Sequence, residues 1–223
     1  MGPSKLVIFG TEAIARIAHF YFTRMSSDYQ VCAFTVDREY IRANSFCDLP
    51  IVAYEEVADR FPPNDFSMFV AIGYTKMNKV REAKYHAAKG LGYSLASFIS
   101  PQCSFLTDIP IGDNCLIMED NTIQPFAQIG NDVIMWSGNH VGHDAVIEDH
   151  CFLTSHVVVS GFTKIGHNSF LGVNATLRDA ITIAPETLVG AGAVIMKDTV
   201  EKGVYLPPRP VLFDKKSDEI AIS

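Results

Sequence analysis

The chain has 223 residues, of which 48% are hydrophobic and 19% charged, and its formal net charge at pH 7 is −7. It has no dense cluster of Lys and Arg, so it lacks the electrostatic footprint of a nucleic-acid-binding protein. No apolar run approaches the roughly 18 residues that a membrane span requires. The apolar stretch near the start is too short for a signal peptide. The sequence therefore predicts a soluble, cytoplasmic protein with no nucleic-acid partner and no membrane span.

Residues 1–98 have no six-residue period and predict a small α/β domain. Strands are expected at 5–9, 30–36 and 66–72, and helices at 12–25 and 81–89. Strands that alternate with helices suggest a parallel, Rossmann-like sheet. Ligands of such sheets bind beyond the carboxyl ends of the strands. A nucleotide site is therefore expected at Gly10, Thr11, Asp37, Gly73 and Tyr74, although these residues are also suited to capping and turning.

A repeat begins where the α/β pattern stops. Stepping by six from Ile99 to Ile195 meets an apolar residue at all 17 positions, which we call the guide residues. A short strand and a turn return the same face every six residues, whereas a helix does not. Three such units make one triangular coil of 18 residues, and coils stack into a solenoid with the guide residues inside. The sequence thus predicts a parallel β-helix over 99–200, followed by a C-terminal tail at 201–223.

Two further columns share this step. Glycine follows the guide residue in six units, and we expect it to provide the positive φ of a tight turn; these are Gly112, Gly130, Gly142, Gly166, Gly172 and Gly190. The fifth position is mostly small or β-branched and includes Cys103, Cys115 and Cys151, which predicts packed thiols. Asn121 and Asn139 lie 18 residues apart in the same column, so their amides are expected to form a ladder if they point inward.

Units such as 165–170 (Ile-Gly-His-Asn-Ser-Phe) and 189–194 (Val-Gly-Ala-Gly-Ala-Val) resemble the hexapeptide repeat of left-handed β-helix acyltransferases. With the short α/β domain in front, the chain resembles the bacterial sugar acyltransferases, a group of nucleotide-sugar N-acetyltransferases and sialic-acid O-acetyltransferases. The resemblance implies a left-handed helix and a front domain that holds the nucleotide of a nucleotide-linked sugar. It also implies a homotrimer with acetyl-CoA bound between neighbouring subunits.

Candidate catalytic residues fall in the unit 141–146. Acyl transfer needs a base that takes the proton of the nucleophile, and a neutral imidazole suits this near pH 7. The resembling enzymes carry a catalytic His followed by an acidic residue here, so we predict His143 as the general base and Asp144 as its orienting partner. Gly161, one coil further, leaves the imidazole uncovered and offers a backbone N–H to the oxyanion.

The other predicted contacts follow from the same resemblance. His156, Val173 and Ala191 join Gly161 as acetyl-CoA contacts, and His140 joins the substrate site. The remaining histidines, His19, His86, His150 and His167, are interpreted as structural, and no metal is expected.

The predicted function is an acetyl-CoA-dependent N-acetyltransferase that acts on a nucleotide-linked amino sugar for surface polysaccharide or glycan biosynthesis. A sugar O-acetyltransferase is the nearest alternative. The same solenoid also supports γ-type carbonic anhydrases, which bind zinc through three histidines, but this chain lacks their His-x4-His spacing. A non-catalytic scaffold subunit is the last alternative and predicts no acetyl-CoA binding.

Overall fold

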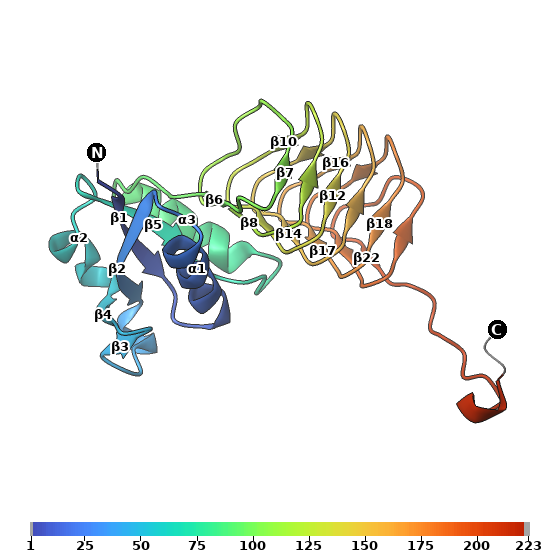
Figure 1. Cartoon of the computed structure of the whole chain (residues 1–223), viewed down its shortest axis with the longest axis horizontal. Helices are drawn as coiled ribbons and strands as arrows, with labels where there is room; N and C mark the ends of the chain where they lie inside the picture. The colour runs from blue at the N-terminus through green and yellow to red at the C-terminus, as the bar shows by residue number, and fades with distance from the viewer. Residues whose placement is uncertain (1, 221–223) are drawn as a thin grey trace.

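The computed structural model describes residues 2–220; Met1 and residues 221–223 of the predicted tail lie outside the described residues. An α/β domain forms one end of the molecule, a triangular β-helix follows, and the C-terminal segment runs away from its far end (Figure 1). No helix among the described residues is long and apolar enough to cross a membrane.

The N-terminal sheet has five strands in the order β3-β4-β2-β1-β5. Their bounds are β1 Ser4–Phe9, β2 Tyr29–Val36, β3 Ser45–Phe46, β4 Leu49–Ala53 and β5 Phe66–Val70. The predicted small parallel sheet is confirmed for β1, β2 and β5; β4 also pairs parallel to β2, while β3 pairs antiparallel to β4 at the edge. The sequence analysis missed β3 and β4. They are short strands joined by a two-residue turn with positive φ at Cys47 and Asp48, where the usual glycine signal of such turns is absent.

Two helices cover opposite faces of this sheet. Leu6 and Ile8 of β1 pack with Phe22 of α1 (Ala13–Arg24), whereas Val7 packs with Tyr85 of α3 (Lys79–Gly90). This follows from the alternation of side chains along a strand. Shorter elements complete the domain: η1 Arg38–Tyr40, η2 Tyr54–Glu56 and α2 Val57–Arg60.

The second domain is a left-handed parallel β-helix, as predicted. From β6 to β18 each strand pairs with the strand 18 residues later, for example Val141 with Val159, whereas β20 pairs with β22 only 16 residues later. Three sheets result: β6-β8-β11-β14-β17-β20-β22, β7-β9-β12-β15-β18-β21 and β10-β13-β16-β19. We call them the first, second and third sheets. Their strands are two residues long: β6 Phe98–Ile99, β7 Ser104–Phe105, β8 Leu116–Ile117, β9 Thr122–Ile123, β10 Gln128–Ile129, β11 Ile134–Met135, β12 His140–Val141, β13 Val146–Ile147, β14 Phe152–Leu153, β15 Val158–Val159, β16 Lys164–Ile165, β17 Phe170–Leu171, β18 Thr176–Leu177, β19 Thr182–Ile183, β20 Leu188–Val189, β21 Val194–Ile195 and β22 Val204–Tyr205.

The interior of the prism is filled by the guide residues and the small column. Cys115 and Cys151 are fully buried there as free thiols. Asn121 and Asn139 also point inward, and the backbone N–H of Asn139 donates to Asn121 Oδ1 at 3.1 Å. The Val157 N–H continues the row by donating to Asn139 Oδ1 at 2.8 Å. Both side chains thus point inward as expected, but each Oδ1 accepts from a backbone N–H of the next coil, and both Nδ2 groups donate to the carbonyl oxygen of Trp136.

The expected role of the glycine column is wrong. None of these six glycines has a positive φ; the positive φ falls two residues later in the unit, as at Asp144 and His150. Glycine is required because the next coil approaches too closely for a side chain. A Cβ on Gly142 would lie 2.5 Å from the backbone nitrogen of Gly161, and one on Gly166 would lie 2.6 Å from that of Pro185.

The first sheet of the β-helix is apolar on its outer face as well. Leu116, Ile134 and Phe152 are fully buried and pack with Phe22 and Phe69 of the α/β domain. The two domains thus share one apolar cluster. The α/β domain covers the first sheet, so the edge between the second and third sheets lies on the opposite side of the prism. At the far end, β22 pairs with β20 inside the predicted tail, and η3 (Ser217–Glu219) follows in an exposed segment.

Candidate functional site

His143 and Asp144 occupy the turn between β12 and β13, on the edge opposite the α/β domain. Asp144 Oδ2 lies 2.9 Å from His143 Nδ1. Both side chains are exposed to solvent, at 51% for His143 and 40% for Asp144. A carboxylate on Nδ1 favours the tautomer with the proton there, which leaves the Nε2 lone pair free to accept a proton.

The next coil places Gly161 directly against this imidazole. A Cβ at Gly161 would lie 2.9 Å from His143 Nε2, so only glycine leaves the reactive nitrogen accessible. Within residues 2–220 the Gly161 N–H has no hydrogen-bond acceptor. Gln124 Oε1 accepts from the His143 N–H at 2.9 Å, and the Phe162 ring packs edge-on against the imidazole at 4.9 Å between centroids. The sequence analysis did not identify Gln124 or Phe162.

The other predicted acetyl-CoA contacts lie on a different edge. His156, Val173 and Ala191 follow β14, β17 and β20, so they form a row along the edge between the first and second sheets. Gly161 lies across the second sheet from them. His140 of β12 is on the outer face of that second sheet, between the two edges, and is half-buried.

The α/β domain holds a cavity of about 640 Å³ at the carboxyl ends of its strands. Gly10, Thr11, Asp37, Gly73 and Tyr74, the predicted nucleotide contacts, all line it. Gly10 has a φ of +124°, and a Cβ there would lie 2.8 Å from the carbonyl oxygen of Ala71, so glycine is needed for this turn.

Two basic side chains also line this cavity. Lys84 lines it together with Arg42, and Lys84 Nζ lies 2.5 Å from Asp37 Oδ1. Lys84 is also 5.2 Å above the ring of Phe9. The sequence analysis missed both cations, because Lys84 lies within α3 and Arg42 lies in a loop without a recognisable pattern.

A fully buried ion pair joins α3 to the β-helix. Arg81 Nε donates to Asp132 Oδ1 at 3.0 Å, and both side chains are fully inaccessible to solvent. Arg81 Nη2 also donates to the carbonyl oxygens of Asp132 and His150, at 3.0 and 2.9 Å. No periodic pattern in the sequence announces this contact, because its partners are 51 residues apart or more.

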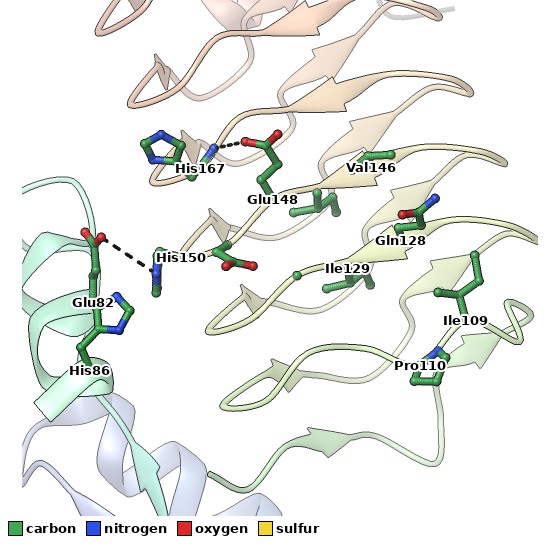
Figure 2. Close-up of a pocket in the computed structure, with 13 residues that line it drawn as sticks. Glu82, His86, Ile109, Pro110, Gln128, Ile129, Val146, Glu148, His150 and His167 are labelled. Atoms are coloured by element: carbon green, nitrogen blue, oxygen red, sulfur yellow. Dashed lines mark hydrogen bonds and ion pairs between the residues drawn. The ribbon is translucent and has the colours of Figure 1, made fainter. Parts of the chain in front are cut away.

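A second cavity of about 660 Å³ lies between α3 and the third sheet, as Figure 2 shows. Its walls carry Glu82, His86, His150, Glu148 and His167. The sequence analysis gave all three of these histidines structural roles, and the structure brings His86 and His150 together beside Glu82.

Known proteins are similar to this chain in sequence and fold. Residues 162–197 match the family described as the hexapeptide repeat of succinyl-transferase. An acyl-[acyl-carrier-protein]–UDP-N-acetylglucosamine O-acyltransferase of Stutzerimonas stutzeri is 28% identical over 99 residues, which are 41% of this chain and 38% of that protein. The chain thus matches well under half of the length of these curated relatives.

Solved structures are similar over nearly the whole chain. PerB from Caulobacter crescentus, in complex with CoA and GDP-perosamine, superposes with a TM-score of 0.80 at 25% identity and covers 92% of this chain and 94% of its own. The acetyltransferase domain of PglB from Neisseria gonorrhoeae shares the fold with a TM-score of 0.80 at 23% identity, covering 93% of this chain and 99% of its own. The chain thus contains hexapeptide repeats and shares its fold with PerB and with the acetyltransferase domain of PglB.

Proposed function

We propose that the protein is an acetyl-CoA-dependent N-acetyltransferase that acts on a nucleotide-linked amino sugar, in the cytoplasm, for surface polysaccharide or glycan biosynthesis. The observation that carries the proposal is the His143–Asp144 pair with Gly161 against its free nitrogen. The complex of PerB with CoA and GDP-perosamine supports the two substrate classes.

The chemical step follows from the positions of these groups. The sugar amine attacks the thioester carbonyl of acetyl-CoA, and His143 Nε2 takes the proton that the amine loses as the C–N bond forms. The Gly161 N–H is placed to stabilise the oxyanion of the tetrahedral intermediate. Collapse breaks the C–S bond, and the imidazolium returns its proton to the leaving thiolate of CoA. Asp144 keeps the imidazole oriented and stabilises its charged form.

The nucleotide of the acceptor sugar would bind in the cavity of the α/β domain. Lys84 and Arg42 supply the positive charge that a diphosphate requires. Asp37 follows β2, the place from which a carboxylate reaches ribose hydroxyls in related sheets. Gly10 allows the backbone to approach the ligand closely.

The assembly that we propose is a homotrimer, and the positions of the two sites support a site shared between subunits. The nucleotide cavity belongs to the domain on the first sheet, whereas His143 is on the opposite edge of the prism. A sugar bound in one chain therefore reaches His143 of a neighbour more directly than its own. The same packing brings the edge with His156 and Val173 beside the edge with Gly161 of another subunit, so acetyl-CoA binds between the two. Sedimentation equilibrium should give a trimer; a stable monomer would contradict the shared site.

An O-acetyltransferase is the second candidate, because the curated relatives are named O-acyltransferases of UDP-N-acetylglucosamine. Both reactions use the same base and oxyanion site. The test is release of free CoA thiol from acetyl-CoA with a panel of nucleotide-linked sugars that differ only in amine or hydroxyl at one carbon. Turnover of the amino sugars alone supports the proposal. Turnover of the hydroxyl sugars alone selects the alternative, and no turnover with any sugar, together with no binding of acetyl-CoA, indicates a scaffold.

A further inference from the structure

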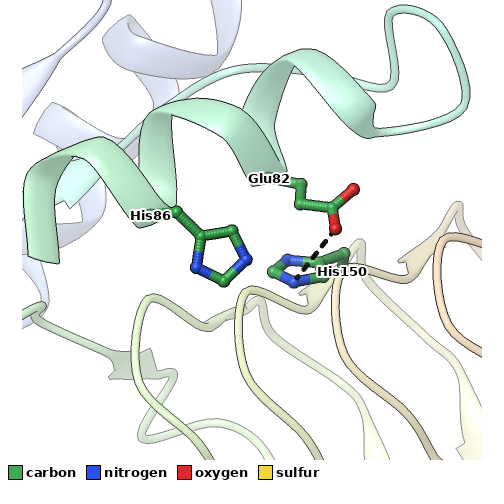
Figure 3. A group of neighbouring side chains, drawn as sticks. All are labelled: Glu82, His86 and His150. Atoms are coloured by element: carbon green, nitrogen blue, oxygen red, sulfur yellow. Dashed lines mark ion pairs between the residues drawn. The ribbon is translucent and has the colours of Figure 1, made fainter. Parts of the chain in front are cut away.

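Three side chains with metal-binding atoms meet where α3 contacts the β-helix. Glu82 and His86 are one helical turn apart and therefore share a face of α3, and His150 comes from the turn after β13 (Figure 3). One ligand atom of each lies within 4.8 Å of the others. The two imidazole rings are 5.5 Å apart between centroids.

The orientation of His150 is fixed from behind by a buried carboxylate. Asp132 Oδ2 lies 2.8 Å from His150 Nδ1, and Asp132 is itself held by Arg81 and by Asn114 Nδ2 at 2.7 Å. This contact places the proton on Nδ1 and aims the lone pair of Nε2 toward Glu82. A carboxylate that orients a histidine through its other nitrogen is the common arrangement behind a metal-bound imidazole.

Glu82 is oriented in a similar way. Asn168 Nδ2 donates to Glu82 Oε2 at 3.0 Å, and the other oxygen, Oε1, faces His150 Nε2 at 4.0 Å. That separation is too long for a hydrogen bond. It approaches the distance of about 3.3 Å between two ligand atoms on a tetrahedral Zn²⁺ whose bonds are about 2.0 Å long.

The set of donors selects the kind of ion. Two imidazole nitrogens and one carboxylate oxygen suit Zn²⁺ and its first-row neighbours, whereas Mg²⁺ prefers oxygen ligands alone. The cavity beside the three residues leaves room for water in the remaining coordination position.

We propose that Glu82, His86 and His150 form a Zn²⁺ site that ties helix α3 to the β-helix, with Asp132 and Asn168 as the groups that position two of the ligands. The ion would add a link between two domains that the apolar cluster, the Arg81 ion pair and further polar contacts, such as Lys79–Glu186, already join. This site lies on the edge between the third and first sheets, whereas His143 lies on the edge between the second and third sheets, so it is separate from the proposed acetyl transfer.

The test uses the full-length chain without an affinity tag, stripped with EDTA and titrated with Zn²⁺ against a chromophoric chelator. We expect one Zn²⁺ per chain and a higher Tm in its presence. His86 is exposed, and its side chain makes no hydrogen bond within the described 2–220 segment, so His86→Ala should fold normally. Its affinity for Zn²⁺ should fall by at least tenfold, since even a lost supporting partner costs about 10–100-fold.

His19→Ala is the matched control, because His19 is in the α/β domain but outside the cluster, and it should bind as the parent does. Co²⁺ should give the visible absorption of a tetrahedral site in the parent and lose it in His86→Ala. Equal Zn²⁺ affinity of His86→Ala and the parent, or no binding by the parent, would overturn the proposal.

Discussion

Two histidines of adjoining turns in the same β-helix illustrate two ways in which a site is built. His143 is half exposed and pairs with the next residue, Asp144, whereas His150 is only 5% exposed and pairs with Asp132 from the previous coil. The residues of the first pair are adjacent in the sequence. The second depends on the stacking of coils and on the docking of α3. A local motif thus indicates the pair at His143, whereas the pair at His150 can be recognised only in the folded structure.

The largest expected effect concerns the exposed edge. His143→Ala should lower kcat by about 10²–10⁴, because the imidazole acts in proton transfer, with little change in the KM for acetyl-CoA. Steady-state kinetics of CoA release would measure both constants. Asp144→Asn should be milder, since the amide can still orient the ring. Parental activity of His143→Ala at neutral pH would mean that the general-base assignment is wrong, and His140 and His156 would then be the residues to test.

An amine acceptor and a hydroxyl acceptor should respond differently to the same substitution. An unprotonated amine is a fair nucleophile by itself, so the residual rate of His143→Ala with an amino sugar should rise with pH. A hydroxyl acceptor should leave the variant close to background at every pH.

At the buried edge the expected loss is in stability. Arg81→Met removes the guanidinium that pairs with the fully buried Asp132. Leaving one charge of a buried pair alone typically costs about 3–5 kcal/mol, so urea unfolding should show a decrease of that size. Lys89→Met is the control: its pair with Asp113 is on the surface, with the lysine side chain 45% exposed, and such pairs contribute up to about 1 kcal/mol. Equal losses in the two variants would contradict the importance of the Arg81 contact.

Two glycines of adjoining coils separate activity from folding. Gly161→Leu should reduce activity on the order of 10²-fold, the cost of misplacing reacting groups by about 1 Å, while the Tm changes little because the side chain points outward beside His143. Gly142→Ala should instead lower the Tm, since its Cβ would meet the backbone of Gly161 at 2.5 Å. Kinetics and thermal unfolding of both variants would distinguish the two roles. If Gly161→Leu were fully active, the acetyl group would have to bind at a place other than the space between Gly161 and His143.

The smallest expected effect is in thiol reactivity. Burial raises the pKa of Cys115 and of Cys151 to about 12, so neither thiol forms a thiolate near pH 8. Labelling of the native protein with iodoacetamide should modify the partly exposed Cys32 and spare both. Because their pKa is raised on folding, their contribution to stability is complete below pH 9, the ordinary value, and is lost as the pH rises toward 12. Rapid native labelling of Cys151 would indicate that the coils open.

Two features of the sequence carry structural information that our sequence analysis interpreted wrongly or missed. The glycine column was predicted to serve positive φ, yet it serves the close approach of the next coil, as at Gly142. The face that receives the α/β domain also has a signal that we missed. Every third unit has an apolar residue before its guide, including Leu116, Ile134 and Phe152, and that 18-residue period marks one sheet of the prism.

The sequence alone determined the β-helix, because each six-residue unit repeats the same local contact and the period survives without knowledge of distant partners. It also indicated His143, whose partner Asp144 is adjacent. The tertiary structure decided where the α/β domain docks, how Arg81 reaches Asp132, and that Glu82, His86 and His150 meet. The contacts between α3 and the β-helix join residues that are 51 to 68 positions apart. Their energies depend on burial and orientation, which arise only when the two domains pack together.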